Sequence, residues 1–450
     1  MSAVRPPNVG PGRSTLVMAG LAGLAAVAFL AGPVGWAAGN VREGFPGYFT
    51  AARLVADGRW SPSVYDDAWF ARETLAVTDG RVGEIYRPNP PVTSLVLVPI
   101  AGLDLLTARR GWLVLEVALV IVTWLFLVAA LPALRAPPLA LGLLALVLVW
   151  TPLQVDLRMG QVYVPLLALH AAALLAILRG RARGSLVAGV ALGAAAAAKL
   201  AALPWLVVLL LRSDQRRTVV TAIVTAAALA ALTLGFAGAA GWGAFFATAW
   251  HDLTADRPSL AVTAYQSTAG FLRHLLTTDP TWNPGGLASL PLVARGIGLA
   301  VSVWVVVVTV LVARRGRADL VAALAVTGGV LALNVAQEYA FTLLLLPAAV
   351  GLGRCAAATT IRPAWTAWLA LAIALIAAPL PYRSPLFDDG WLALLAYPRL
   401  YGAWLLWAWL AREIAREIAV EGAAGVESAA IVEAGADGDD QRATAETRHS

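Results

Sequence analysis

The sequence predicts an all-α polytopic membrane protein, and three observations support this fold class. Of the 450 residues, 60% are hydrophobic and 13% are charged, whereas a soluble domain has about 25% charged residues. The apolar residues form long continuous runs instead of alternating ten-residue strands, which favours helices over a β-barrel. Arginine clusters separate these runs, as they do in cytoplasmic loops. We therefore attribute the net charge of +6 to membrane topology and expect no nucleic-acid partner.

The alternation of apolar runs and arginine clusters predicts the domain organisation. It indicates roughly ten to thirteen transmembrane helices, with both termini in the cytoplasm. We expect a disordered cytoplasmic lead at 1–13, a membrane domain at 14–412 and a disordered, acidic cytoplasmic tail at 413–450. Two long outer loops are predicted, at 39–91 and 241–287. All loops are too short to hold a soluble nucleotide-binding domain.

Three shorter segments carry local predictions. The apolar rhythm of 45–55 predicts a helix in the membrane interface, with Tyr48 and Phe49 at headgroup depth. The run 92–106 is short for a span, so we expect it to re-enter the membrane or to lie at the outer leaflet. The run 186–211 should form two short helices, because a proline interrupts it.

The sequence places four polar islands on the outer side, at 43–91, 154–161, 241–287 and 337–339. If they converge, they form a cavity open to lipid and to the outer water. Lys199, the only lysine, could lie near this side; a charge in an apolar helix is costly and indicates function, unless it snorkels to the interface. Such an arrangement suits an enzyme with a lipid-borne donor, and it also suits a transporter.

A series of motifs in a fixed order then narrows the choice. They are Phe45-Pro46-Gly47-Tyr48-Phe49-Thr50-Ala51-Ala52-Arg53-Leu54, Gly58-Arg59, Tyr65-Asp66, Asn89-Pro90-Pro91 with Pro99, Met159-Gly160-Gln161-Val162, Ala188-Gly189-Val190-Ala191-Leu192-Gly193 with Lys199 and Pro204, and Tyr265-Gln266-Ser267. In order and spacing, the chain resembles glycosyltransferase family 87 of the GT-C superfamily over roughly residues 14–410.

The resemblance implies a GT-C-like fold with a long first extracytoplasmic loop and an active site on the outer face of the bacterial inner membrane. It implies transfer of a hexose, with mannose as one candidate, from a polyprenyl-phosphate donor to a glycan or glycolipid of the cell envelope. The family's catalytic aspartate is expected where this chain has Gly44. The neighbouring Glu43 and the more distant Asp66 are therefore our candidates for the catalytic base.

The predicted substrate-binding residues lie in all four polar islands and at the lysine. They are Tyr48, Arg87, Asn89, Arg158, Gln161, Lys199, Gln266 and Glu338. The phosphate of the leaving group gains negative charge during transfer, and Arg87, Arg158 and Lys199 are the cations proposed to stabilise it. No cluster has metal-ligand spacing, so we expect neither a metal nor a cofactor.

Several of these residues also have a purely structural interpretation. Asp66 could cap a following helix, Arg158 could pair with Asp156, Gln161 could satisfy backbone groups at a helix start, and Glu338 could be an exposed helix end. Two other functions remain open. One is a flippase or other transporter of lipid-linked sugars, and the other is a non-catalytic relative that binds polyprenyl phosphate.

Overall fold

The computed structural model describes residues 12–421, apart from residues 88, 181, 201, 255–257, 361 and 388–389. Within this part of the chain all regular secondary structure is helical, and β-pairing is limited to two isolated bridges. The helices are α1 (Arg13–Phe29), α2 (Gly35–Gly39), α3 (Phe45–Ala56), α4 (Asp67–Val77), α5 (Leu105–Ala130), α6 (Pro137–Val149), α7 (Thr151–Met159), α8 (Tyr163–Leu178), α9 (Ala182–Lys199), α10 (Leu203–Leu210), α11 (Arg216–Thr233), α12 (Gly238–Thr254), α13 (Thr268–Leu276), α14 (Pro291–Ala313), α15 (Ala318–Ala332), α16 (Leu345–Ala357), α17 (Pro363–Ala377) and a C-terminal helix at 398–421.

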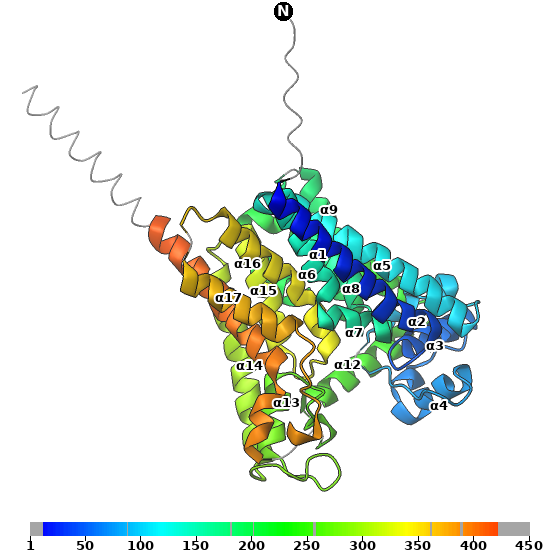
Figure 1. Ribbon diagram of the computed structural model, residues 1–450. Coiled ribbons are helices and arrows are strands. Elements are labelled where there is room, and N and C mark those ends of the chain that lie inside the picture. The colour runs from blue at the N-terminus through cyan, green and yellow to red at the C-terminus, as the bar shows by residue number, and fades with distance from the viewer. Residues whose placement is uncertain are drawn as a thin grey trace, which may run out of the picture.

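The long helices run between two ends of the molecule (Figure 1). The start of α1 and the last described residues of the C-terminal helix lie toward one end, which we call the arginine-rich end. There, Arg212 after α10 donates to the carbonyl of Gly316, next to Arg317, at 2.6 Å. The helices α4 and α13 lie at the opposite end, which we call the loop end (Figure 1).

Five helices within the described residues are long and apolar enough to cross a membrane. They are Arg13–Gly39, Leu105–Ala130, Ser213–Thr233, Pro291–Ala313 and Glu338–Ala357. The pair α6 and α7, bent by 50°, adds a sixth if it counts as one span. The apolar helices α8, α15 and α17 have 16, 15 and 15 residues, fewer than the roughly 20 that cross a bilayer. The all-α polytopic class is confirmed, and the larger predicted number of spans depends on counting these short helices.

Small residues bring α9 and α11 into close contact. A Cβ at Gly189 would lie 2.6 Å from the carbonyl oxygen of Thr218, and one at Gly193 would lie 2.4 Å from that of Ala222. Helices in membranes pack closely through such small-residue faces. The contact fixes α9 firmly, and with it Lys199 at its end.

The break between α9 and α10 confirms the prediction of two short helices. The backbone of Leu200 turns to a φ of +52°, and α10 starts at Leu203 with Pro204 in its first turn. The run 92–106 also does not form a long helix before α5: it contains the short 3-10 turns Pro91–Leu95 and Val98–Ile100.

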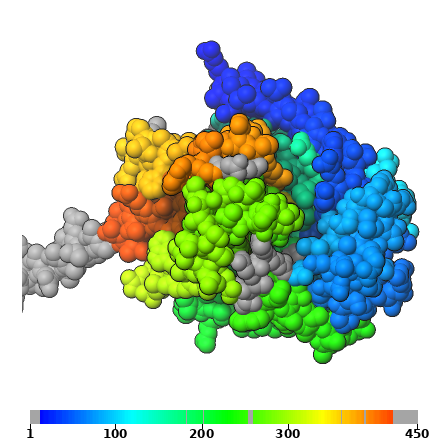
Figure 2. Space-filling view, turned by 90° about the horizontal axis from the view of Figure 1, so that it is seen from below, coloured from blue at the N-terminus to red at the C-terminus, as the bar shows by residue number. Residues whose placement is uncertain are grey.

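The first outer loop is folded around aromatic side chains. Trp60, Tyr65, Phe70 and Tyr86 pack in one buried cluster that also holds Phe245 of α12. Seen from the loop end, the green segment of α12 and α13 lies between the blue first loop and the orange residues near the C-terminus (Figure 2). The two outer loops therefore contact each other, as convergence of the polar islands requires.

Two sequence-based expectations need correction. The helix predicted at 45–55 exists as α3, but Tyr48 and Phe49 are buried within the protein, at 4% and 0% exposure, and do not face lipid headgroups. They are buried because the α3 helix is covered by other segments of the fold. The predicted boundary of the tail at 413 is also wrong, since the C-terminal helix continues to residue 421; the rest of the tail and residues 1–11 lie outside the described residues.

Candidate functional site

The only lysine lies in a cluster of polar and aromatic side chains. The Nζ of Lys199 donates to Asn89 Oδ1 at 2.5 Å and to the hydroxyl of Tyr48 at 3.2 Å. The ring centroids of Tyr48 and Tyr163 are 5.6 and 5.9 Å from Nζ, within the range of a cation–π contact. Tyr339 packs against Tyr163, with the ring centroids 5.2 Å apart. We call these residues, together with Gln161, the Lys199 cluster.

Gln161 joins this cluster through α7 and the turn that follows. Its Oε1 accepts a hydrogen bond from the hydroxyl of Tyr48 at 2.7 Å. The turn is held by Asp156, whose carboxylate accepts from the backbone N–H of Tyr163 and Val164 at the start of α8. Thus Asp156, and not Gln161, caps the helix, so the amide of Gln161 is free to bind Tyr48.

A carboxylate that the sequence analysis did not select binds Gly44, a residue that lies close to Gln161. Glu84 Oε1 accepts a hydrogen bond from the backbone N–H of Gly44. Burial raises the pKa of the Glu84 carboxyl from 4.5 to about 7; the charge of Glu43 adds to the rise and the Gly44 hydrogen bond opposes it. Glu84 is partly exposed, so its carboxyl is protected from bulk water without being sealed off.

Gly44 itself connects this carboxylate to the cluster. Its φ is +107°, a region that residues with a Cβ rarely adopt. A Cβ there would lie 2.6 Å from Gln161 Nε2 and 2.6 Å from the carbonyl oxygen of Met159. Contacts therefore run without interruption from Glu84 through Gly44, Gln161 and Tyr48 to Lys199.

The structure brings together four of the predicted binding residues: Tyr48, Asn89, Gln161 and Lys199. Glu43, predicted as a base, is exposed and adjoins Gly44 in sequence. The predicted roles of all five stay predictions, because contacts among them do not identify a ligand.

Three other predicted residues lie outside the cluster. Asp66 is exposed and caps α4 by accepting a hydrogen bond from the backbone N–H of Trp69 at 2.8 Å. This is the structural role suggested for Asp66 as the alternative to catalysis. Arg87 joins the two outer loops by ion pairs with Asp67 at 2.5 Å and Asp252 at 3.2 Å. Arg158 is exposed, whereas Asp156, its suggested partner, is fully buried in the cap of α8.

The last two predicted residues belong to a second buried group. Glu338 is 6% exposed, so it is not an exposed helix end. Its carboxylate pairs with Arg399 at 2.7 Å and accepts a hydrogen bond from the hydroxyl of Tyr382 at 2.6 Å. The Oε1 of Gln266 accepts from the backbone N–H of Arg399, and its amide donates to two carbonyl groups. Tyr382 also lines an apolar cavity of about 260 Å³. The adjacent residue Tyr339 belongs to the Lys199 cluster, so the two groups share one chain segment.

Sequence reasoning missed Glu84, Tyr163, Tyr339 and Arg399. Two of them had a signal, because Tyr163 follows Gly160-Gln161 closely and Tyr339 follows Glu338. It also missed a buried ion pair within α5, in which Arg109 and Glu116 lie 3.1 Å apart. Arg109 contacts the carbonyl of Leu157, and so supports α7 beneath the cluster.

These features define a class: a polytopic α-helical membrane protein with a preformed polar cluster at one end of its helices. The sequence model of glycosyltransferase family 87 matches residues 88–347, more than half of the chain. The chain therefore belongs to glycosyltransferase family 87 and is a membrane glycosyltransferase by family. No curated protein and no solved structure matches it.

The matched range divides the cluster. Asn89, Gln161, Lys199 and Tyr339 lie within it, whereas Tyr48 precedes it, as do the adjoining residues Gly44 and Glu84. The family match therefore does not reach the segment in which the base was sought. For that segment, the choice of a catalytic base depends on the geometry around Gly44.

Proposed function

We propose that the protein transfers a hexose, with mannose as one candidate, from a polyprenyl-phosphate donor to a glycan or glycolipid of the bacterial envelope. The observation that carries the proposal is a half-buried ammonium group, oriented by Tyr48 and Asn89, with a carboxylate of raised pKa bound to Gly44. On this proposal the loop end faces away from the cytoplasm, and both termini are cytoplasmic.

Lys199 is suited to bind the phosphate of a donor that arrives from the bilayer. It ends α9, and two nearby side chains, Leu200 in the break after α9 and Leu203 at the start of α10, are 45% and 43% exposed. A polyprenyl chain can lie on that apolar surface while its phosphate reaches the ammonium. The phosphate gains a negative charge when the sugar leaves, so a fixed cation stabilises the transition state more than the ground state.

Glu84 replaces Glu43 and Asp66 as the base that we propose. Asp66 is engaged as a helix cap and Glu43 is exposed, whereas Glu84 is bonded to Gly44 beside the cluster. A base works best when its pKa lies near the operating pH, and a value of about 7 meets that condition.

The reaction step follows from these positions. Glu84 takes the proton of an acceptor hydroxyl, and the oxygen attacks the anomeric carbon from the face opposite the phosphate. The new C–O bond forms as the bond between the anomeric carbon and the phosphate oxygen breaks. Polyprenyl phosphate leaves with the bonding electron pair beside Lys199, and the anomeric configuration is inverted.

The test is an assay of purified protein in lipid with radiolabelled polyprenyl-phosphate mannose and glucose, together with a mixture of envelope glycolipids. We expect Glu84→Gln to reduce transfer by about 10²- to 10⁴-fold. Glu43→Gln and Asp66→Asn are matched controls, since each neutralises one carboxylate of the same loop, and both should keep most of the activity. Loss on Glu43→Gln with activity kept in Glu84→Gln would assign the base to Glu43 instead.

Donor binding is measured in parallel, because it separates the remaining alternatives. Lys199→Met should weaken binding of the phosphate donor, whereas Glu84→Gln should not. A wild-type protein that binds the donor and transfers nothing would support the non-catalytic relative, a reading favoured by Gly44 at the expected aspartate position. Failure to bind either donor would contradict the proposal as a whole.

A further inference from the structure

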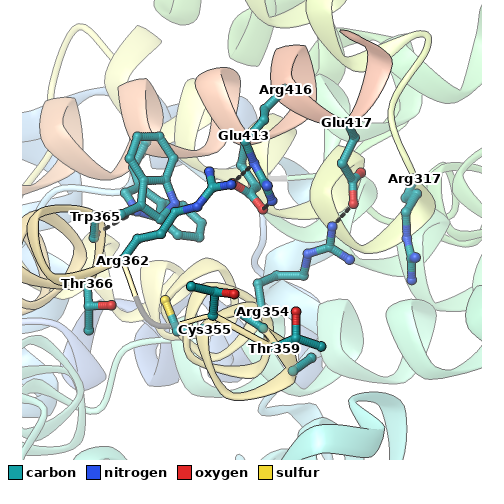
Figure 3. Close-up of a pocket in the computed structure, with 14 residues that line it drawn as sticks. Arg317, Arg354, Cys355, Thr359, Arg362, Trp365, Thr366, Glu413, Arg416 and Glu417 are labelled. Carbon is teal, nitrogen blue, oxygen red and sulfur yellow. Dashed lines mark hydrogen bonds and ion pairs between the residues drawn. The ribbon is translucent and has the colours of Figure 1, made fainter. Parts of the chain in front are cut away.

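A cavity of about 630 Å³ lies at the arginine-rich end, and none of the residues of the Lys199 cluster lines it. Figure 3 shows it between the end of α16, the start of α17 and the C-terminal helix. Its volume falls within the range of about 300–1,000 Å³ that is usual for small-molecule sites. The cavity has no part in the reaction proposed above.

The charged residues of this cavity are unbalanced. Four arginines line it, against two glutamates: Arg317, Arg354, Arg362 and Arg416, with Glu413 and Glu417. Three of the arginines have carboxylate partners. Arg416 binds both oxygens of Glu413, at 2.5 and 3.1 Å, Arg354 binds Glu417, and Arg317 lies 3.6 Å from Asp319.

Arg362 is the exception. It is exposed, and it forms no ion pair with any carboxylate among the residues that the structure describes. Its guanidinium points across the cavity toward Glu413 and Arg416 (Figure 3). Three carboxylates, those of Glu413, Glu417 and Asp319, cannot neutralise four guanidinium groups, so the cavity keeps a positive potential that an anion would lower.

The arginines are held in place before any ligand arrives. Carboxylate partners restrict Arg354 and Arg416, so binding an anion costs less side-chain entropy. Guanidinium groups match the oxygens of a phosphate in a bidentate geometry. Hydroxyl groups of Thr359, Thr360 and Thr366 on the lining supply further donors.

The remaining wall is apolar and aromatic. Trp365 and Trp409 line the cavity, and the indole N–H of Trp409 donates to the carbonyl of Trp365 at 3.1 Å. Tryptophan is enriched where membrane meets water, and basic pockets between helices on the cytoplasmic side bind lipid headgroups. A ligand with a phosphate and an attached glycerol or acyl portion would match both halves of the lining.

We propose that this cavity binds a phosphate-bearing anion, and that its source is the headgroup of an anionic phospholipid in the leaflet at the arginine-rich end. The guanidinium groups of Arg362 and Arg416 would take the phosphate oxygens. Trp365 and Trp409 would contact the glycerol and the first acyl carbons.

The test uses the full-length protein purified in a neutral detergent. Thermal unfolding and native mass spectrometry measure binding of a short-chain phosphatidylglycerol, with a phosphatidylcholine of the same chain length as the zwitterionic comparison without net charge. We expect phosphatidylglycerol to bind at least fivefold more tightly, and Arg362→Gln to remove most of that difference. Arg362 has no ion pair to lose, so this variant should fold normally.

Arg315→Gln is the matched control, because Arg315 is exposed at the same end, lies outside the cavity and carries the same charge. It should leave binding unchanged. Competition by inorganic phosphate would show that phosphate alone suffices, whereas competition only by lipid would assign the site to the membrane. Equal binding of the two lipids, or equal loss in Arg315→Gln and Arg362→Gln, would overturn the proposal.

Discussion

Placing at Gly44 the aspartate that the family resemblance implies there should fail, and the geometry of Gly44 gives the reason. The perturbation is Gly44→Asp, with Gly44→Ala as its partner without the carboxylate. The backbone has a φ of +107° and a ψ of −77°, and a Cβ would contact Gln161 Nε2 and the Met159 carbonyl oxygen at 2.6 Å each. The side chain of Gln161 can move, but the Met159 carbonyl belongs to the backbone of α7 and cannot move cheaply.

The expected magnitude has two parts. A side chain in such a strained backbone conformation costs about 1–3 kcal/mol. Forcing a Cβ into a packed site costs about another 1–3 kcal/mol. Because the two effects act on the same position, we expect both variants to lose roughly 2–6 kcal/mol in the free energy of unfolding.

Thermal unfolding and sugar transfer are then measured on the purified variants in the same lipid. Both variants should be less stable than the parent, and Gly44→Asp should be no more active than Gly44→Ala. Gly47→Ala is the control: Gly47 lies in α3, and its Cβ would meet Glu84 at an ordinary 3.6 Å. A Gly44→Asp protein with full stability would refute the packing argument, and one that keeps full transfer after Glu84→Gln is added would refute the assignment of Glu84.

Three further predictions follow from the charged groups. The pH–rate profile for transfer should have an ascending limb near pH 7, because Glu84 acts as a base only when it is deprotonated, and Glu84→Gln should abolish this limb. Because the pKa of Glu84 is raised in the folded state, protonation of Glu84 stabilises the fold. This stabilisation is complete below pH 4.5 and is lost as the pH rises through about 7. Glu84→Gln should therefore not lower the melting temperature at pH 8. Glu338→Gln should cost about 3–5 kcal/mol in chemical unfolding, because it leaves Arg399 buried without its carboxylate, whereas adding Arg399→Met should recover part of that loss; an equal loss in the double variant would contradict the pairing.

The sequence predicted those parts of the site that local patterns encode. A proline and a lysine in an apolar run indicated the break between α9 and α10, and the structure has it after Lys199. The residues Tyr48 and Asn89 were selected from one island and Gln161 from another, and all three lie in one cluster with the lysine. The selection of Lys199 rests on the cost of a charge in an apolar helix, and that of the other three on motifs, both of which a single sequence reveals.

Pairings between distant residues could not be predicted in the same way. Glu338 and Arg399 are 61 residues apart, and no local pattern marks them as partners. Glu84 had no visible link to Gly44, because that contact depends on how the loop after α4 returns to α3. The aromatic residues of α3 were assigned to the interface since a helix pattern shows that a face is apolar, but not whether lipid or protein covers it.

The C-terminal helix gives the two ends of the molecule a mechanical connection. It carries Arg399 in its first turn and Arg416 near its last described turns. An α-helix rises by 1.5 Å per residue, so these two residues are about 25 Å apart along its axis. Because a helix resists stretching, it acts as a strut of fixed length. Sliding it along its axis would therefore displace two features at once: Arg399, the partner of Glu338, at one membrane face, and the walls of the arginine-lined cavity at the other.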